Sequence, residues 1–326
     1  MLSPFVNPKI FEHDVEAVPT RNGYGEGVVA AGKKNSNVVV LCCDLTESTR
    51  SLAFQKEFPD RFFEIGVAEQ NMAGMSAGMA ACGKIPFIAS YAVFSPGRNW
   101  DQIRVSIAYS DLNVKIMGAH AGISVGPDGA THQALEDMAI MRVLPHMVVL
   151  APCDVHETRK AVLAAAEYNG PVYIRFTREK TPIITMDNAP FEIGKALVLS
   201  EGTDVTLIAC GPLVYEALLA AKELEAEGIR AEVINCPSVK PLDTATILKS
   251  VRKTRRVVTI EEHQITGGLF GAIAEFLSSR FPVPILPVGM PNVFGESGEP
   301  DELLEKYEMK ADRIIAQVHR LLHAAK

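Results

Sequence analysis

The chain has 326 residues, of which 48% are apolar and 22% are charged, and its formal net charge is −7. This composition is typical of a globular protein of about two domains and excludes a disordered chain, and the acidic excess disfavours a nucleic-acid-binding protein. No apolar run reaches the roughly 18 residues that a membrane-spanning helix needs, and the N-terminus lacks the pattern of a signal peptide. Six cysteines without a CxxC spacing indicate neither a disulfide framework nor a zinc site. We therefore expect a protein of the cytoplasm with no membrane or nucleic-acid partner.

Short apolar runs alternate with helical patterns along the first half of the chain. The expected strands are residues 38–42, 62–65, 86–90, 114–118, 147–150 and 172–175. The expected helices are residues 49–58, 70–81, 100–109, 133–143 and 155–168. The apolar runs are rich in Val, Ile and Phe and do not alternate strictly with polar residues. This order and composition predict a parallel sheet with helices on both faces.

Residues 181–193 are rich in proline and polar residues and show no period, so we place the domain junction there, with domains at 1–190 and 191–326. After this junction the alternation of strands and helices restarts. The expected strands are residues 205–210, 231–235, 257–261 and 283–287, and the expected helices are residues 214–227, 243–251, 269–279 and 312–325. The second half therefore predicts a smaller α/β domain.

Two polar clusters directly follow expected strands, where ligands of parallel sheets bind. The first cluster, residues 44–49, has two interpretations. It either caps the following helix, or it binds an anion through Ser48 and the helix N-terminus. The second contains Glu69, which begins a helix that is small and apolar on nearly all sides. We expect this helix to be buried, which places the carboxyl group at a dry junction. A buried carboxylate is costly without a partner, so this position suits an acid or a hydrogen-bond donor.

Residues 120–133, HAGISVGPDGATHQ, form the densest group of polar residues in the chain. They contain His120, Asp128 and His132 together with three glycines, and they show no helix or strand period. A loop of this length is seldom a simple connection, and histidine supplies acid–base chemistry near neutral pH. The alternative is a surface turn with exposed histidines. No HExxH or CxxC spacing accompanies the loop, so it does not predict a zinc site.

Arginines and aromatic residues lie beside other expected strand ends. Arg21, Arg175 and Arg178 suit a phosphate or a carboxylate, because a guanidinium group binds these anions through two parallel hydrogen bonds. The alternative for each is a surface ion pair. Tyr91 and Phe94 follow the strand of residues 86–90, and taken alone they favour a place in the core over a cofactor platform.

In their order and spacing, these motifs resemble transketolase over nearly the whole chain. GISVGPDGATHQ is similar to the transketolase loop that ends in Asp-Gly-x-Thr-His-Gln, IGVAEQNMAG resembles the segment with the catalytic glutamate, and SYAVF resembles the aromatic segment under the pyrimidine of the cofactor. The resemblance implies a thiamine-diphosphate-binding α/β domain of the pyrimidine type with a parallel sheet. A smaller α/β domain of the transketolase C-terminal type would follow. Pro127 departs from the family loop, which more often has an acidic residue there.

The resemblance also implies a role for each matching residue. Glu69 would hydrogen-bond the pyrimidine of thiamine diphosphate and help to activate this cofactor, and His120 would contact the reacting end of the donor sugar, so these two are the expected catalytic residues. The remaining cofactor contacts would come from Asp44, Leu45, Tyr91 and Phe94. The remaining substrate contacts would come from Arg21, Ser48, Asp128, His132 and Arg178.

The motif that holds the metal in full-length transketolases is missing from this chain. In those enzymes an N-terminal domain holds Mg²⁺ and the diphosphate through Gly-Asp-Gly…Asn, and no such motif occurs here. We therefore interpret the chain as the C-terminal subunit of a split transketolase, a transferase of the pentose phosphate pathway that acts only with a separate N-terminal subunit. The Mg²⁺ ligands would lie on that partner. The family suggests two copies of each chain and sugar phosphates as substrates, and the start at Met1 favours a natural subunit over a fragment.

Three other interpretations remain open. A 1-deoxyxylulose-5-phosphate synthase has a similar VGxDGxTHQ loop, but it normally forms one long chain and tends to lack the equivalent of His120. The beta subunit of a 2-oxo-acid dehydrogenase is a separate chain of similar length, but it does not usually carry this loop. A non-catalytic module would keep the fold without activity. In all of them the C-terminal domain is expected to serve assembly rather than chemistry.

Overall fold

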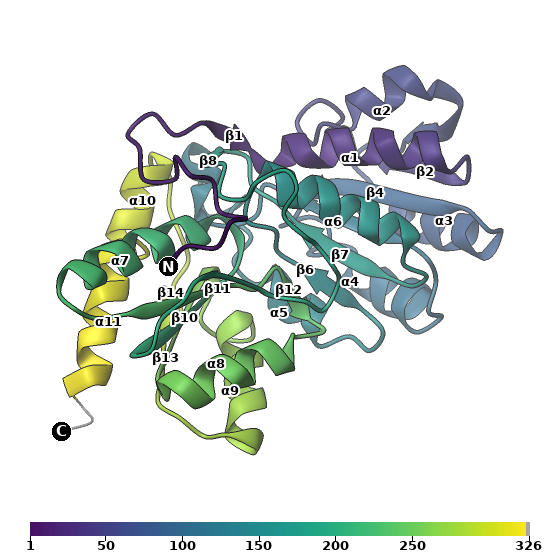
Figure 1. The fold of residues 1–326 in the computed structure, drawn as a ribbon. Helices are drawn as coiled ribbons and strands as arrows, with labels where there is room; N and C mark the ends of the chain where they lie inside the picture. The colour runs from purple at the N-terminus through teal and green to yellow at the C-terminus, as the bar shows by residue number, and fades with distance from the viewer. Residues whose placement is uncertain (324–326) are drawn as a thin grey trace.

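The computed structural model describes residues 1–323, which form two α/β units lying side by side (Figure 1). The first unit is built on a seven-stranded sheet with the order β12-β6-β7-β5-β4-β2-β3, in which only β12 and β6 pair antiparallel. Its strands are β2 (Val38–Cys42), β3 (Phe62–Glu64), β4 (Ile85–Tyr91), β5 (Lys115–Ala119), β6 (Val148–Leu150), β7 (Val172–Arg175) and β12 (Ser238–Lys240). The strands expected at 38–42 and 172–175 have the predicted bounds, whereas β3 and β6 differ by one residue at one end and β4 and β5 by one residue at both ends.

Helices cover both faces of this sheet, because successive side chains of each strand point to opposite faces and both sets are apolar. In β2, Val38 and Val40 share a core with α1, α2 and α6, whereas Val39 and Leu41 pack on the other face with α3, η2 and α5. The helical segments are α1 (Thr20–Lys34), α2 (Leu52–Glu57), η1 (Pro59–Arg61), α3 (Glu69–Ala81), α4 (Trp100–Gln102), the π-helical η2 (Ile103–Ala108), η3 (Ile123–Asp128), α5 (Asp137–Arg142) and α6 (Val155–Glu167).

The second unit has a five-stranded sheet with the order β14-β13-β10-β11-β9, parallel except for the pair of β9 and β11. Its strands are β9 (Leu197–Ser200), β10 (Val205–Ala209), β11 (Ala231–Asn235), β13 (Val257–Gln264) and β14 (Ile285–Met290). Its helical segments are η4 (Gly211–Leu213), α7 (Val214–Ala226), α8 (Thr244–Thr254), α9 (Leu269–Arg280), α10 (Pro300–Lys306) and α11 (Ala311–His323). The α/β alternation predicted from the sequence is confirmed in both halves.

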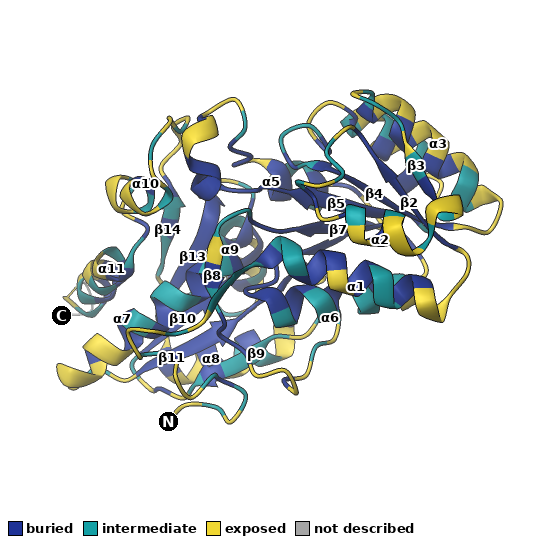
Figure 2. Ribbon diagram, turned by 90° about the horizontal axis from the view of Figure 1, so that it is seen from above, coloured by how far each residue is buried: buried dark blue, intermediate teal, exposed yellow. Residues whose placement is uncertain are grey.

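One apolar core joins the two units. Met138 and Met141 of α5 belong to the same cluster of buried side chains as Ile247 of α8 and Ile273 of α9. In Figure 2 the central strands of both sheets are dark blue, and the exposed residues lie mainly on the outer faces of helices and in loops. The strand β12, which follows the expected junction, also pairs with β6 of the first sheet. The division at residue 190 stays a prediction, because the two units share both a core and a sheet.

The glycine-rich segment at the start of α1 was not predicted to be helical, because glycine disfavours helices. The structure shows that two of these glycines lie where α1 crosses α6. A Cβ atom on Gly23 would lie 2.3 Å from the carbonyl oxygen of Val155, and one on Gly27 would lie 2.8 Å from Cβ of Val162. Close packing against α6 therefore outweighs the local cost of glycine. The short elements β9, β12 and α10 were also not predicted.

The expectation that α3 is buried on nearly all sides is wrong for one of its faces. Met72, Ala73 and Ala77 are buried against the sheet. The opposite face carries Gly74 and Gly78, and a Cβ atom added to either would have no atom within 4 Å. This face, on which Asn71 and Met75 are also exposed, is therefore open within the chain. None of the helices described is both long and apolar enough to cross a membrane.

Candidate functional site

The polar residues singled out in the sequence converge at the carboxyl end of the first sheet. Strands β7, β5, β4 and β2 are neighbours in that order, so the segments that follow them meet along one edge. A short antiparallel ribbon of β1 (Ala17–Pro19) and β8 (Lys180–Pro182) adds the start of α1 to this edge. The backbone N–H of Thr177 donates to Oγ1 of Thr20 at 2.7 Å, which brings Arg21 to the same side as Arg178.

Glu69 is the first residue of α3, and it is only 2% exposed. Its Oε1 accepts a hydrogen bond from the Ser90 hydroxyl at 3.2 Å, and its Oε2 accepts one from Nη1 of Arg98 at 3.1 Å. The buried carboxylate thus has the partner that its burial requires, and that partner is a cation whose side chain is 50% exposed. Because each carboxylate oxygen accepts more than one hydrogen bond, Glu69 can also accept a donor from a ligand.

Two aromatic rings, Tyr91 and Phe94, form a wall beside Glu69. The rings stack with centroids 5.9 Å apart and an interplanar angle of 18°. His132 meets the ring of Phe94 edge-on at 5.4 Å, and the Arg98 guanidinium lies 4.2 Å from the centroid of the same ring. Both rings are only partly buried. Tyr91 also packs against the core cluster of β2, β4 and β5, and the role of the two rings as a cofactor platform stays a prediction.

His120 lies against this aromatic wall and is held in one orientation. Its ring stacks on Tyr91 with centroids 4.0 Å apart, and Nε2 lies 3.2 Å from Nη1 of Arg21. Nε2 also lies 3.3 Å from the carbonyl oxygen of Ser48, so it accepts from Arg21 in one tautomer of the neutral ring and donates to Ser48 in the other. Nδ1 is buried and has no protein partner. Burial, with the charge of Arg21 as the next cause, lowers the pKa of His120 to about 3. The ring is neutral at physiological pH, and its Nδ1 atom is available to a ligand.

Positive charge accumulates around His120. Nη1 of Arg21 donates to the carbonyl oxygen of Ser48 at 3.0 Å, and Nε of Arg21 is buried without a partner. Burial, together with the charges of Arg50 and Arg178, lowers the pKa of Arg21. Like charges repel one another, and Arg178 is balanced by Asp128 and Glu179, 3.3 and 3.5 Å away, whereas Arg21 forms no ion pair within residues 1–323. The geometry therefore favours an anionic ligand at this end of the site.

The other expected site residues take different places. Asp128 pairs with Arg178 at 3.3 Å, so the structure brings these two together as an ion pair. Ser48 meets Arg21 and His120 through its carbonyl oxygen. Asp44 has a φ of 57°, and its N–H donates to Oε1 of Glu64 at 2.7 Å. Leu45 packs on the core beside α1 and is partly buried. The cofactor contacts of Asp44 and Leu45 stay predictions.

Arg175 is not part of this site. It is buried and pairs with Asp137, with Nε 2.9 Å from Oδ2, so neither the anion site nor the surface ion pair expected for it is present. Sequence reasoning also missed Ser90 and Arg98, which hold Glu69. Ser90 ends a predicted strand next to the aromatic residues, and this position was the available signal. No sequence signal pointed to Arg98, because it lies in a polar segment with neither a helix nor a strand period.

The donors and acceptors of the site fit thiamine diphosphate. A buried carboxylate that can accept a ring N–H lies beside an aromatic wall, and a buried histidine nitrogen without a partner lies on the same wall. Among residues 1–323, no group of three or more His, Cys, Asp or Glu side chains is placed to hold a metal ion.

Comparison with known proteins gives concordant matches. The family model of the transketolase pyrimidine binding domain matches residues 16–183, and that of the transketolase C-terminal domain matches residues 194–314. A protein of Methanocaldococcus jannaschii described as a transketolase C-terminal section is 49% identical over 301 residues, which cover 91% of this chain and 94% of the relative. The 6-deoxy-6-sulfo-D-fructose transketolase subunit of a Clostridium species is 42% identical, with 95% of this chain and 97% of the relative covered.

Solved structures agree with these matches. A chain of a split-gene transketolase, described as an inactive beta4 tetramer, superposes with a TM-score of 0.87 at 47% identity, over 94% of this chain and 99% of that chain. Transketolase from Campylobacter jejuni superposes with a TM-score of 0.79 at 22% identity, over 96% of this chain and 50% of that chain. At 22% identity, the match with the Campylobacter jejuni enzyme shows only that the fold is shared.

Proposed function

The chain belongs to the transketolase family, and we propose that it is the subunit of a two-chain transketolase that transfers a two-carbon ketol unit from a ketose phosphate to an aldose phosphate. The observation that carries this proposal is the buried Glu69 carboxylate next to the aromatic wall, with guanidinium groups at the far end of the same site. One end suits an activated ring cofactor, and the other suits the phosphate of a sugar.

Thiamine diphosphate supplies the carbon nucleophile and electron sink that two-carbon transfer needs. Glu69 would accept a hydrogen bond from its pyrimidine, and Tyr91 and Phe94 would line that ring. Ser90 and Arg98 fix the position of the Glu69 carboxyl group before a ligand arrives.

In the tautomer in which Nε2 accepts from Arg21, His120 would donate its Nδ1–H to an oxygen at the reacting end of the donor sugar, with the ring held against Tyr91. Arg21, Arg178 and His132 would hold the phosphate, with Ser48 beside them. In this arrangement Asp128 would exchange part of its ion pair with Arg178 for a substrate hydroxyl.

The partner would be a separate N-terminal subunit that supplies Mg²⁺ and the site of the diphosphate. A second copy of this chain would complete an assembly with two copies of each subunit. The open, small-residue face of α3 supports this, because such a face lets another backbone approach closely. All six cysteines are free. This is usual in reducing compartments, and it supports a place in the cytoplasm.

The donor and acceptor sugars have two candidate classes. Sugars of the pentose phosphate pathway are the first. The second follows from relatives named for 6-deoxy-6-sulfo-D-fructose and for apulose 4-phosphate. Phosphate and sulfonate are both terminal anions, so the same arginines would bind either. Other thiamine enzymes, such as a 1-deoxyxylulose-5-phosphate synthase or a 2-oxo-acid dehydrogenase, would need the same Glu69 but not the phosphate-binding residues of a ketose donor.

A two-carbon transfer assay tests the proposal. Xylulose 5-phosphate and ribose 5-phosphate are supplied with thiamine diphosphate and Mg²⁺, first to this chain alone and then to this chain mixed with the N-terminal subunit. We expect activity only in the mixture, and we expect Arg21→Met to raise the KM of the phosphorylated donor at least tenfold. Replacing the donor by 6-deoxy-6-sulfofructose separates the two substrate classes. If the mixture binds the cofactor but transfers no two-carbon unit from any of these ketoses, the proposal that the chain is a transketolase subunit is refuted.

A further inference from the structure

The loop of residues 120–136, which carries His120, Asp128 and His132, is held largely by the C-terminal unit. Within the loop, the N–H of Gly122 donates to the carbonyl oxygen of Ala134 at 2.9 Å and so brings its two ends together. From outside, the N–H of Gln264 donates to the carbonyl oxygen of Leu135 at 2.8 Å, and Nε2 of Gln133 donates to that of Glu296 at 2.9 Å.

Glu262 makes the central contact of this loop with the C-terminal unit. It lies on β13, is 2% exposed, and accepts the backbone N–H of Ser124 on Oε1 at 2.7 Å. Gly122 has a φ of 95°, and a Cβ atom there would lie 2.2 Å from the same Oε1. Only glycine lets the loop pass this close to the carboxylate. The sequence of the loop is therefore matched to a side chain 138 residues away.

Arg175 joins the backbone of Glu262 to the end of the loop and to the start of α5. Nη1 donates to the carbonyl oxygen of Glu262 at 3.0 Å, and Nη2 donates to that of Ala134 at 3.3 Å. Its Nε lies 2.9 Å from Oδ2 of Asp137. The backbone that carries Glu262 is thus tied to both the end of the loop and the start of α5, and the carboxylate cannot shift without them.

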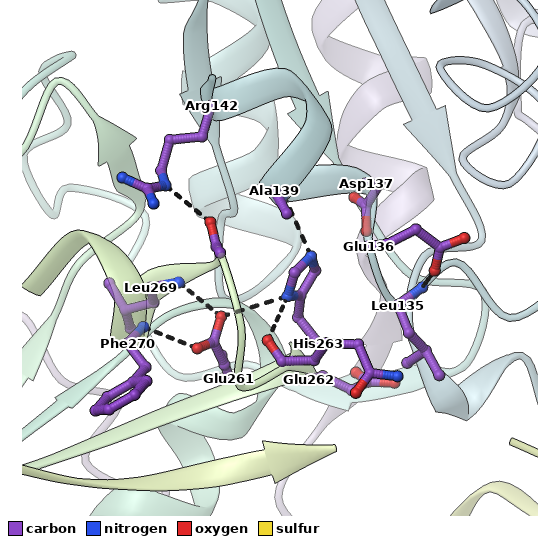
Figure 3. A network of polar contacts seen from close by, with 12 residues as sticks. Leu135, Glu136, Asp137, Ala139, Arg142, Glu261, Glu262, His263, Leu269 and Phe270 are labelled. Atoms are coloured by element: carbon purple, nitrogen blue, oxygen red, sulfur yellow. Dashed lines mark hydrogen bonds and ion pairs between the residues drawn. The ribbon is translucent and has the colours of Figure 1, made fainter. Parts of the chain in front are cut away.

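The neighbouring carboxylate of β13 makes different contacts. Glu261 accepts the backbone N–H groups of Leu269 and Phe270, at 2.7 and 2.8 Å, and so caps α9 (Figure 3). Successive residues of a strand point to opposite faces, which separates Glu261 from Glu262. The two carboxyl groups are both buried and lie on the same strand, but only Glu262 accepts a hydrogen bond from the loop of the site.

We propose that Glu262 is a positioning residue for the transketolase reaction, through which the C-terminal domain holds the loop of His120 and Asp128 in register with the aromatic wall. Ser124 lies four residues from each of these side chains, so a displacement of its backbone moves both. The effect of Glu262 on catalysis rests on the proposed function. The contact between Glu262 and Ser124 can be tested without substrate. It assigns the C-terminal domain a part in substrate binding as well as assembly.

The test uses three variants in the complex with the N-terminal subunit. Glu262→Leu removes the acceptor at nearly constant volume, Glu262→Gln keeps an oxygen that accepts the Ser124 N–H, and Glu261→Gln is the matched control at the α9 cap. The steady-state KM and kcat for xylulose 5-phosphate are measured. Hydrogen–deuterium exchange at C2 of bound thiamine diphosphate, without substrate, reports the Glu69 side of the site. Backbone amide exchange of residues 120–136 reports the loop.

Glu262→Leu is expected to raise the KM of xylulose 5-phosphate at least tenfold and to speed amide exchange of the loop at least tenfold. Cofactor C2 exchange should stay within twofold of wild type. Glu262→Gln should lie close to wild type in all three readouts, and Glu261→Gln should lower the Tm without changing the KM. An unchanged loop exchange in Glu262→Leu, or equal changes in Glu262→Leu and Glu261→Gln, would overturn the proposal. A wild-type complex that transfers no ketol unit would refute the proposed function. The amide exchange of the loop would still decide whether Glu262 holds it.

Discussion

Two arginine–carboxylate pairs of α5 offer a direct measurement of how the junction between the units is stabilised. Asp137 pairs with Arg175, and their side chains are 1% and 8% exposed. Arg142 pairs with Glu275 through two hydrogen bonds of 2.8 and 2.7 Å, but the Glu275 side chain is 65% exposed. The chemistry is the same in both pairs, and the burial differs. The comparison of Asp137→Asn with Glu275→Gln therefore isolates the effect of burial.

Asp137→Asn keeps an acceptor for the hydroxyl of Tyr173, which donates to Oδ2 at 2.7 Å, and removes only the charge. Burial by itself lowers the pKa of Arg175, and the carboxylate of Asp137 is the main group that raises it again. Leaving one partner of a buried pair without its counter-charge costs about 3–5 kcal/mol. With an unfolding entropy of about 2.1 cal/mol/K per residue, this lowers the Tm by roughly 4–7 °C.

Glu275→Gln removes an exposed pair, for which the expected loss is under about 1 kcal/mol. The assay is urea unfolding of each variant, followed by circular dichroism, together with the Tm from calorimetry. The slope of the free energy of unfolding against urea should stay constant, since the surface exposed on unfolding does not change. If Asp137→Asn loses no more stability than Glu275→Gln, the reasoning from burial is refuted.

Three further outcomes are expected. In the complex with the N-terminal subunit, Glu69→Gln should lower the rate of two-carbon transfer at least about 100-fold; a smaller loss would remove Glu69 from the chemistry, and Glu275→Gln, outside the site, serves as the control. Nuclear magnetic resonance of labelled histidine should show His120 neutral throughout pH 5–8, because burial lowers its pKa to about 3; a titration step near pH 6.5 would contradict this. Burial also lowers the pKa of Lys115 to about 7, so between pH 7 and about 10.4 the unfolded chain binds a proton that the native chain lacks. The free energy of unfolding of the wild type relative to Lys115→Met should therefore rise with pH in that window, by at most about 1.4 kcal/mol per pH unit, and the absence of a rise would show that the lysine stays charged in the native chain.

Regular strands and helices were the part of the fold that local patterns could predict. The bounds of β2 and β7 follow from short apolar runs between turn residues, and the amphipathic α11 follows from its 3.6-residue period. Departures from these patterns have tertiary causes. The helix α1, for which no prediction was made, forms where its glycines pack on α6. The apolar α3 read as a buried helix, although one of its faces is open within the chain.

Within the site, the residue types and their order along the chain were sufficient to select Glu69, His120, Asp128 and His132. Their partners were not predictable in the same way. Arg98 reaches Glu69 from 29 residues away, and Glu262 reaches Ser124 from 138 residues away. No local period links such pairs, because their contact depends on how two strand ends and two units pack.

The sequence by itself determined the alternation of strands and helices, the family, and the side chains able to do chemistry, since these depend on the local order of residue types. Only the tertiary structure decided which of those side chains meet. It turned Asp128 toward Arg178, made the ring of His120 neutral by burial, and buried Arg175 with Asp137 away from the site. Charge and protonation depend on burial and on neighbours distant in sequence, and the packing of the whole chain sets both.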